Sequence, residues 1–552
     1  MDFLFNFLDT EPWKAWLTYD PKNPLLFNSG LFLGLFTVFY LGYILMRRKF
    51  RLRLLYVVAF SLFFYYKSSG LYFLLLVGTT ILDYFLARLI DREENPPRKK
   101  LYLTLSIISN LGVLGYFKYT NFFLESINQL SGSDFHFKAI ILPVGISFFT
   151  FQSISYIIEI YRKEVKLAET FLDYIFYISF FPQLVAGPIV RAKDFLPQVY
   201  SKIRLSKEEL NEAILLIIGG LIKKAVISDY ISVNFVDRVF DAPNSYTAME
   251  NLMATYGYAI QIYCDFSGYS DMAIGLALLL GYRLPINFNV PYQATSITEF
   301  WRRWHISLST WLKDFLYISI GGNRNGSFGG YFFTAIFFIG GIWWGIAMWN
   351  KSTIPLFIAG GSLLVFVATI LFAKKSQRAL YTNFNLMTTM LLGGLWHGAS
   401  LRFIVWGALH GLALAFHKLF TAIFPKRENS PIWLNKIWQV FAVLITFHFV
   451  CFGWIFFRAR SFPLALDVIN NIADLRWQPQ NWWIIIQGYQ YVFLLILIGF
   501  IWHFTPKKII NQMAAIFYKM PLPVKGGFVG LVFWLVYVMA GTGTQPFIYF
   551  QF

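Results

Sequence analysis

Histidine is the residue type whose placement in this sequence offers the clearest chemistry. The chain has seven histidines. Six of them lie in or beside long apolar runs: His305, His397, His410, His417, His448 and His503. An ionisable group in an apolar segment is costly and therefore needs either partners or a function. Because imidazole gains and loses a proton near neutral pH, these residues are the first candidates for acid–base chemistry.

His397 is the strongest of these candidates. It lies in the sequence GGLWHGAS, directly after Trp396 and between glycines. Glycine beside a reactive imidazole leaves room for a substrate, or for another backbone, to approach closely. The alternative interpretation is a buried histidine that is hydrogen-bonded and purely structural.

His305 lies in a block of charge beside an apolar run. Its surroundings read EFWRRWHISLSTWLKDFLYISIGGNRNG, and the apolar spacing predicts a helix near 300–318. The charged neighbours are Glu299, Arg302, Arg303, Lys313, Asp314 and Arg324. Such a block can form a basic mouth for an anionic ligand such as a nucleotide or a pantetheine phosphate. The alternative is an amphipathic helix at the membrane interface.

Two acidic residues interrupt a third apolar run. Asp265 and Asp271 lie in the sequence QIYCDFSGYSDMAIG. Carboxylates in such a run need internal partners, and we expect the arginines at 302–303 to supply them. The sequence predicts a structural or tunnel-lining role for both residues.

Several chemistries are excluded by inspection. The chain has no GxxxxGK[ST], GxGxxG, HExxH or CxxC motif and no Asp-x-Asp pair. A motor ATPase, a zinc protease and a metal-dependent glycosyltransferase each need groups that are missing. The sequence therefore predicts neither a bound metal nor a bound cofactor.

The composition places these residues in a membrane. Of 552 residues, 57% are hydrophobic and 14% are charged, against about 25% charged in soluble domains. Apolar runs that approach the roughly 30 Å core of a bilayer recur along the chain, which predicts an all-α polytopic protein in contact with lipid. The net charge of +18 comes from basic residues at the ends of these runs, as in cytoplasmic loops, so no nucleic-acid partner is expected.

The basic clusters also predict the orientation of the chain. Clusters at 47–53, 88–100 and 162–166 are each separated by two apolar runs, so they lie on one side. That side should be cytoplasmic, which places the N-terminus outside. Residues 1–28 are acidic with two tryptophans and lack the pattern of a signal peptide, so we expect an interfacial N-terminal segment.

Two segments are too irregular for ordinary spans. Residues 171–190 contain Pro182, Gly187 and Pro188 and have basic residues on both sides, which predicts a re-entrant segment. A kinked ordinary span is the alternative. The second segment, 383–397, is short and polar for a span and ends at His397.

The order of several motifs resembles the membrane-bound O-acyltransferase family, and within it the branch that O-acetylates bacterial polysaccharides such as alginate. The similar segments are LPVGISFFTFQSISYIIEIYR (142–162), FFPQLVAGPIVR (180–191), YCDFSGYSDMAIG (263–275), the block from Asn287 to Arg324, LLGGLWHGAS (391–400), WGALHG (406–411), FGWIFFRA (452–459) and FIYFQF (547–552). Together they span nearly the whole chain.

This resemblance implies a single membrane domain over residues 1–552, built as a helical ring around a transmembrane tunnel with re-entrant segments. The principal catalytic histidine of the family falls on His397, and its second position, Asn or His in the family, falls on His305. The residues we assign to donor binding or to the tunnel are Trp396, Trp304, Arg302, Arg303, Asp314, Asn323, Arg324, Asp265, Asp271 and His410.

The resemblance also implies the substrates and the location. Acetyl-CoA enters from the cytoplasm of a bacterium, and the acetyl group travels through the tunnel of this inner-membrane protein toward hydroxyls of an exported polysaccharide. A periplasmic or extracellular relay protein is expected as a partner, with the closing segment and an added hairpin as candidate docking surfaces. The sequence departs from the family at 329–378, where we expect an extra two-helix hairpin.

The expected chemistry is acyl transfer from a thioester, which needs a base for the hydroxyl proton and stabilisation of the oxyanion. Burial favours a neutral His397, which can act as that base. His305 either donates to the carbonyl or orients the acceptor. Direct proton abstraction and an acyl-histidine intermediate are both open. The alternative functions are D-alanyl transfer to teichoic acid from a carrier protein, and a transporter or flippase without catalysis.

Overall fold

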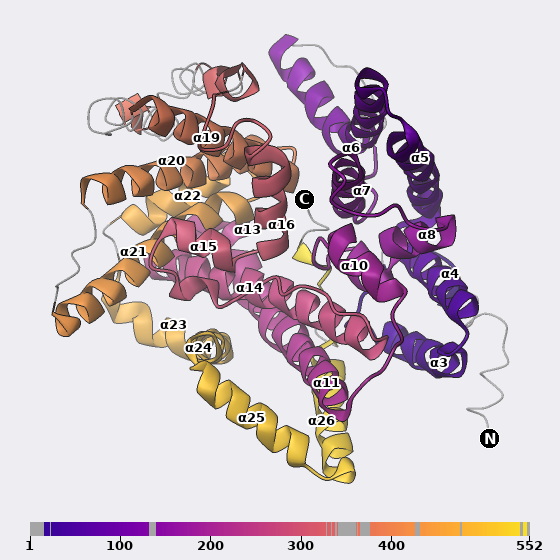
Figure 1. The fold of residues 1–552 in the computed structure, drawn as a ribbon. Helices are drawn as coiled ribbons and strands as arrows, with labels where there is room; N and C mark the ends of the chain where they lie inside the picture. Colours follow the sequence, from indigo (N-terminus) through magenta and orange to yellow (C-terminus); the bar gives the residue numbers. More distant parts are fainter. Residues whose placement is uncertain are drawn as a thin grey trace. The chain divides into compact units, whose positions relative to one another are not determined.

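The computed structural model describes residues 16–21, 24–131, 140–326, 376–424, 431–474, 477–540 and 545–548, with short pieces of 328–364. In these ranges every regular element is a helix, as Figure 1 shows. The predicted N-terminal segment 1–28 and the predicted hairpin at 329–378 fall mostly outside the described residues.

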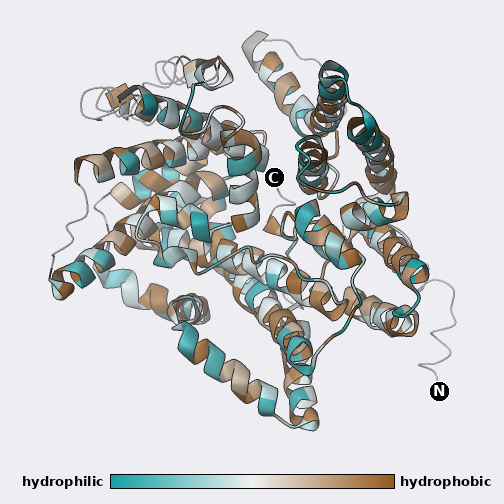
Figure 2. Ribbon diagram, viewed as in Figure 1, coloured by the Kyte–Doolittle hydropathy of each residue, from teal (hydrophilic) through white to brown (hydrophobic). Residues whose placement is uncertain are grey.

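Apolar residues, brown in Figure 2, recur along most helices of the described chain. Five are long and apolar enough to cross a membrane: Phe50–Arg92, Pro96–Asn128, Leu401–Ile423, Ile432–Arg458 and Leu522–Met539. The pair Pro479–Gly488 and Gln490–Phe504, bent by 86°, makes a sixth if it is one span. The prediction of an all-α multi-pass membrane protein is confirmed, whereas the ring and its tunnel stay predictions.

The chain groups into two compact units, each described by itself. Unit 1 comprises residues 1–226, 264–286 and 507–551. Its helices include α3 (Gly30–Met46), α4 (Phe50–Ser69), α5 (Phe73–Arg92), α6 (Pro96–Ser131), α7 (Ile146–Tyr161), α8 (Phe171–Ser179), α9 (Phe181–Leu184), α10 (Ala192–Val199), α11 (Lys207–Leu221), α25 (Lys507–Lys519) and α26 (Leu522–Ala540). The helix α14 (Ala248–Leu279) contributes residues to both units.

A buried carboxylate ties α5 to α6 within unit 1. Asp83 accepts hydrogen bonds from Ser106 Oγ at 2.6 Å and from Asn110 Nδ2 at 2.9 Å. All three side chains are buried. Interhelical hydrogen bonds of this kind hold helices together in lipid, where burial of apolar area supplies no such force.

The segment 171–190 is broken, as its prolines and glycine predict. Helix α8 ends at Ser179, Phe180 leaves the helical conformation at ψ 106°, and α9 adds four residues. Both helices are far shorter than the roughly 20 residues of a span. Every residue from Asp173 to Val190 is buried, so protein surrounds the broken backbone. The re-entrant path itself stays a prediction.

Unit 2 comprises residues 227–263, 287–506 and 552. Its main elements are α13 (Asp237–Asp241), η5 (Pro291–Gln293), α15 (Ile297–Arg303), α16 (Ile306–Trp311), the π-helical turn η6 (Leu312–Tyr317), α19 (Ser376–His397), α20 (Leu401–Ile423), α21 (Ile432–Arg458), α22 (Phe462–Ala473), α23 (Trp482–Gly488) and α24 (Gln490–Phe504).

Glycines let α19 and α20 pack as an antiparallel hairpin. A Cβ atom at Gly394 would overlap the carbonyl oxygen of Phe403, and one at Gly407 would overlap that of Met390. The short segment expected at 383–397 is thus the C-terminal part of one continuous helix that begins at Ser376. This hairpin fixes the place of His397 at the end of α19.

Candidate active site

His305 lies at a break between two short helices. The single helix expected near 300–318 is wrong, because α15 ends at Arg303 and α16 begins at Ile306. Between them His305 adopts φ 44° and ψ 55°, in the left-handed region. Such a conformation costs a residue with a side chain about 1–3 kcal/mol, and residues of this kind cluster at active sites and ligand-binding positions. The His305 side chain is fully buried.

Asn287 stabilises the break between α15 and α16, which we call the His305 corner, and it fixes the orientation of the His305 ring. Its main-chain oxygen accepts the Ile306 amide at 2.9 Å. Its Oδ1 accepts from the amide of Ser307 at 3.2 Å and from Ser307 Oγ at 3.0 Å, and lies 3.2 Å from His305 Nδ1. An atom that accepts an amide N–H is the carbonyl oxygen, so Nδ1 of His305 must donate to it. In the neutral ring the lone pair is then on Nε2.

His397 ends α19 inside an aromatic enclosure. Its ring centroid lies 5.0 Å from those of Trp396 and Trp406 and 5.2 Å from that of Phe457. Only 4% of the residue is exposed. The space beside the flanking Gly398 is filled by the Phe403 ring. The expectation that this glycine leaves room for a substrate is therefore wrong, and it serves helix packing instead.

The two candidate catalytic histidines contact the same indole. The centroid of Trp396 lies 6.0 Å from that of His305 and 5.0 Å from that of His397. The structure thus brings together two residues that are far apart in the sequence. Trp304 is also buried here, with its centroid 5.0 Å from those of Phe288 and Trp454.

A third histidine continues the cluster. The indole N–H of Trp301 donates to His410 Nδ1 at 3.3 Å, so the neutral ring of His410 carries its proton on Nε2. Trp406 lies between His410 and His397, with centroids 4.7 Å and 5.0 Å away. His410 therefore packs against the same tryptophan as His397. The segment WGALHG, which begins at Trp406, was among those similar to the family, but its contact with His397 could not be predicted from the sequence.

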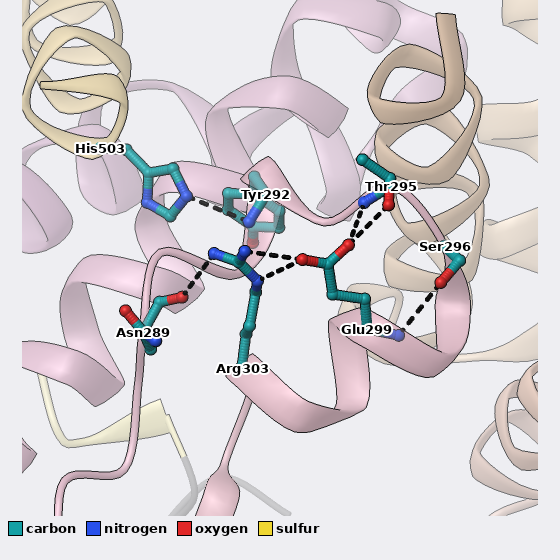
Figure 3. Close-up of polar contacts among 7 residues, drawn as sticks. All are labelled: Asn289, Tyr292, Thr295, Ser296, Glu299, Arg303 and His503. Atoms are coloured by element: carbon teal, nitrogen blue, oxygen red, sulfur yellow. Dashed lines mark hydrogen bonds and ion pairs between the residues drawn. The ribbon is translucent and has the colours of Figure 1, made fainter. Parts of the chain in front are cut away.

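A polar pocket of about 520 Å³ lies beside α15. It is lined by Asn289, Ser296, Thr298, Glu299, Arg302, Arg303 and His417. Figure 3 shows how Glu299 organises one side: it accepts from Arg303 Nη2 at 2.6 Å and from the Thr295 amide at 2.8 Å. Burial raises the pKa of Glu299, but the hydrogen bonds from Thr295 and Arg303 outweigh it, so the pKa lies below its ordinary value. Glu299 is thus a carboxylate that neutralises Arg303.

Arg302 and His417 complete the pocket. Arg302 is exposed, and His417 Nδ1 lies 3.0 Å from Thr298 Oγ1. Of the two arginines expected to bind an anion, Arg303 is held by Glu299, whereas Arg302 faces solvent. The pocket can accept an anionic group through Arg302 and neutral donors.

Asn323 and Arg324 form a turn against α19 and α20. Gly321 and Gly322 adopt φ 115° and 56°, which glycine alone tolerates readily. Asn323 Oδ1 accepts from Tyr317 at 2.5 Å and from Lys418 at 3.3 Å. Arg324 is exposed on this turn. These contacts give Asn323 a structural task, and donor binding by both residues stays a prediction.

Asp314 lies on η6, between Trp311 and the glycine turn. Its side chain is half-buried. Its assignment to donor binding or to the tunnel also stays a prediction.

The expected partners of Asp265 and Asp271 are wrong. Asp265 pairs with Lys224 at 2.6 Å, and Asp271 pairs with Lys223 at 2.7 Å. These lysines lie in an apolar run, and nothing in the sequence favours them over the adjacent arginines at 302–303. Both pairs belong to unit 1.

His503 was not assigned to the site, yet it holds the chain that leads into α15. Its Nε2 accepts the Tyr292 amide at 3.0 Å (Figure 3). Its main-chain oxygen accepts from Gln293 Nε2 at 2.9 Å. Tyr292 OH in turn donates to the Ala259 oxygen at 2.7 Å. The preceding Val290 has φ 41°, a strained value for a β-branched residue. Only long-range contacts reveal this role.

Replacing His503 with alanine should lower the thermal stability of the protein, because the buried Tyr292 amide loses its acceptor. The loss should be about 1–3 kcal/mol. Glutamine at position 503 offers an oxygen acceptor and should recover part of it. Thermal unfolding in detergent measures both effects, with His448→Ala as the control because His448 is exposed. Equal melting temperatures for His503→Ala and the wild type would contradict the assignment.

Comparison with known proteins identifies the family. A sequence model of the membrane-bound O-acyltransferase family matches residues 166–390. The chain is 36% identical over 482 residues to a peptidoglycan O-acetyltransferase of Helicobacter pylori, which covers 82% of this chain and 80% of that protein. It is 36% identical over 448 residues to the probable alginate O-acetylase AlgI of Pseudomonas aeruginosa, covering 80% of this chain and 73% of that protein.

A more distant relative transfers a different group. The teichoic acid D-alanyltransferase of Bacillus subtilis is 27% identical over 325 residues, covering 58% of this chain and 69% of that protein. The resemblance seen in the motifs is thus confirmed over most of the sequence, and the His305 corner lies within the matched family region. The chain is an O-acyltransferase and belongs to the membrane-bound O-acyltransferase family.

Proposed function

We propose that this protein transfers acetyl groups from cytoplasmic acetyl-CoA toward hydroxyls of an exported cell-envelope polysaccharide. Support comes from the relatives named for acetyl transfer, which are more similar and cover more of the chain than the D-alanyltransferase does. The observation that carries the proposal is the pair of buried histidines on either side of Trp396. Two imidazoles in one enclosure suit proton transfer during acyl exchange.

His397 acts as the general base. It takes the proton of the acceptor hydroxyl while the hydroxyl oxygen forms the ester bond to the acetyl carbon. The carbon–sulfur bond of the thioester then breaks, and the imidazolium returns the proton to the leaving thiolate. A base in position contributes about 10²–10⁴-fold to such a reaction.

His305 orients the acceptor. Because Asn287 fixes the Nδ1 proton, the lone pair of His305 is on Nε2. That atom accepts hydrogen bonds from sugar hydroxyls and does not donate to a thioester carbonyl. Of the two roles open from the sequence, orientation is therefore the one that the Asn287 contact favours.

Arg302 and the polar pocket bind the phosphates of the donor. The pocket offers an exposed guanidinium, the Thr298 hydroxyl and the His417 imidazole. A phosphate is held well by charge-assisted hydrogen bonds from such groups. With the N-terminus outside, the donor arrives from the cytoplasm and a relay protein on the outer face receives the acetyl group.

Purified protein in proteoliposomes tests the proposal. Acetyl-CoA labelled in the acetyl group should be consumed only with acceptor or relay protein present, and label should appear as an ester on the acceptor. A D-alanyl carrier protein offered instead should give no product. Movement of labelled polymer without thioester consumption would instead show that the protein is a transporter, and this result would overturn the proposal.

A further inference from the structure

Unit 1 buries a complete ion pair that the proposed chemistry does not use. Lys224 is 1% exposed and Asp265 is 3% exposed. Their Nζ and Oδ1 atoms are 2.6 Å apart. Taking two charges out of water costs several kcal/mol per ion, and their attraction offsets this only when further hydrogen bonds complete the geometry. A pair retained at such a cost in a membrane protein calls for a specific task.

The further hydrogen bonds come from the C-terminal segment. Lys224 Nζ donates to the main-chain oxygen of Gln545 at 3.1 Å. Asp265 Oδ2 accepts the main-chain amide of Ile548 at 3.0 Å. The cation and the anion therefore hold opposite ends of one four-residue stretch. Both contacts are to main-chain atoms, so they recognise the backbone of the segment and not particular side chains.

Phe547 anchors the same stretch. It is fully buried, with its centroid 5.4 Å from that of Phe266 and 4.9 Å from that of Tyr269. Tyr269 in turn stacks on Phe27 at 4.6 Å. The Phe547 ring thus packs against Phe266 and Tyr269, at a position between the two backbone contacts. The expectation that the closing segment is a surface for a partner is wrong for Phe547 and Ile548, which are both buried.

The backbone conformation around Lys224 directs its side chain toward α14. Lys224 lies in a π-helical stretch, Ile222–Ser228, directly after α11. A Cβ at Gly220 would crowd the Gly268 oxygen, so α11 and α14 approach closely just before this stretch. Widened turns of this kind are frequent at functional sites. Here two successive lysines reach acids six residues apart on α14.

We propose that the Lys224–Asp265 pair is a binding site for a peptide backbone, filled by the protein's own residues 545–548, and that acetyl transfer requires this segment to be seated. The requirement of acetyl transfer for this segment rests on the proposed function, whereas the binding site itself does not. The ion pair is then a positioning device: it fixes where the end of the chain enters unit 1. It acts on the segment and not on the substrate.

The test is hydrogen exchange of the C-terminal peptide in the full-length protein in detergent. The Ile548 amide should be protected in the wild type. The double variant Lys224→Met/Asp265→Leu replaces the pair by apolar residues of similar size, which usually preserves a fold. Its C-terminal peptide should exchange at least about tenfold faster, because the backbone contacts that protect it are gone. Size-exclusion profile and melting temperature confirm that the variant is folded.

A matched control is present on the same two helices. Lys223 and Asp271 also form a pair, at 2.7 Å, but it is more exposed. The variant Lys223→Met/Asp271→Leu should leave exchange of the C-terminal peptide as in the wild type. Phe547→Ala keeps the ion pair and removes the anchor, so it should accelerate exchange by an intermediate factor.

Acetyl transfer is measured on the same samples. We expect the Lys224/Asp265 variant to lose transfer and His448→Ala, at an exposed position outside the site, to keep it. Wild-type exchange in the Lys224/Asp265 variant overturns the binding site, and full transfer despite faster exchange overturns the need for seating. If the wild type itself transfers no acetyl group, the proposed function fails, while the exchange result still decides the binding site.

Discussion

Replacing His397 with alanine should abolish acetyl transfer and leave the protein inserted in the membrane. The variant loses the base that accepts the hydroxyl proton, which alone is worth about 10²–10⁴-fold in rate. His305 cannot take over, because Asn287 and the left-handed backbone hold its ring in place. The measurement is consumption of labelled acetyl-CoA by proteoliposomes, with the acetylated product quantified in parallel.

Two further variants separate chemistry from packing at position 397. The ring is packed against Trp396, Trp406 and Phe457, so alanine also opens a cavity. His397→Gln fills more of that space without a group that can exchange protons near neutral pH, and it should be as inactive as alanine. His448→Ala, at an exposed position, should transfer normally. Substantial transfer by His397→Gln would refute the role of His397 as base.

Replacing Asn287 with leucine should reduce turnover by about 10²-fold, because a misplaced catalytic group costs that much. Leucine is similar in size but removes the oxygen that three groups of His305 and Ser307 use. The His305 ring then loses both its orientation and its preferred tautomer. Donor binding through the polar pocket should not change, so kcat falls while the KM for acetyl-CoA stays as in the wild type.

Asn287→Asp is the conservative counterpart. A carboxylate accepts from the same donors, so this variant should recover a large part of the turnover lost in Asn287→Leu. Steady-state kinetics on proteoliposomes compare the two variants, and thermal unfolding shows whether both are folded. A rise in KM at unchanged kcat would mean that Asn287 shapes donor binding and that His305 is not positioned through it.

The membrane class and the histidines could be predicted because they depend on local composition. Apolar runs identify helices in lipid regardless of tertiary contacts, and an imidazole in such a run is conspicuous by itself. His397 and His305 were found in this way, and Trp396 was found with them. The structure added what joins them: an indole that both rings contact.

The rest depended on contacts between distant segments. Asn287 and His305 are 18 positions apart, and Tyr292 and His503 are 211 apart. No periodicity marks such pairs. The predicted partner of Asp265 is wrong for the same reason. The prediction favoured the adjacent arginines at 302–303, but the residue that pairs with Asp265 is Lys224, on a π-helical stretch. The prediction of one helix over 300–318 is wrong because the spacing of apolar residues does not reveal a left-handed residue such as His305.

The backbone at position 305 restricts which side chains can occupy it. Asparagine, aspartate and histidine adopt left-handed dihedral angles several-fold more often than other residues with a side chain, whereas β-branched residues almost never do. The resemblance implies asparagine or histidine at this position. Both residues tolerate left-handed dihedral angles, so the backbone conformation alone permits either of them. Substitutions at position 305 are therefore limited to the few residue types that tolerate these dihedral angles.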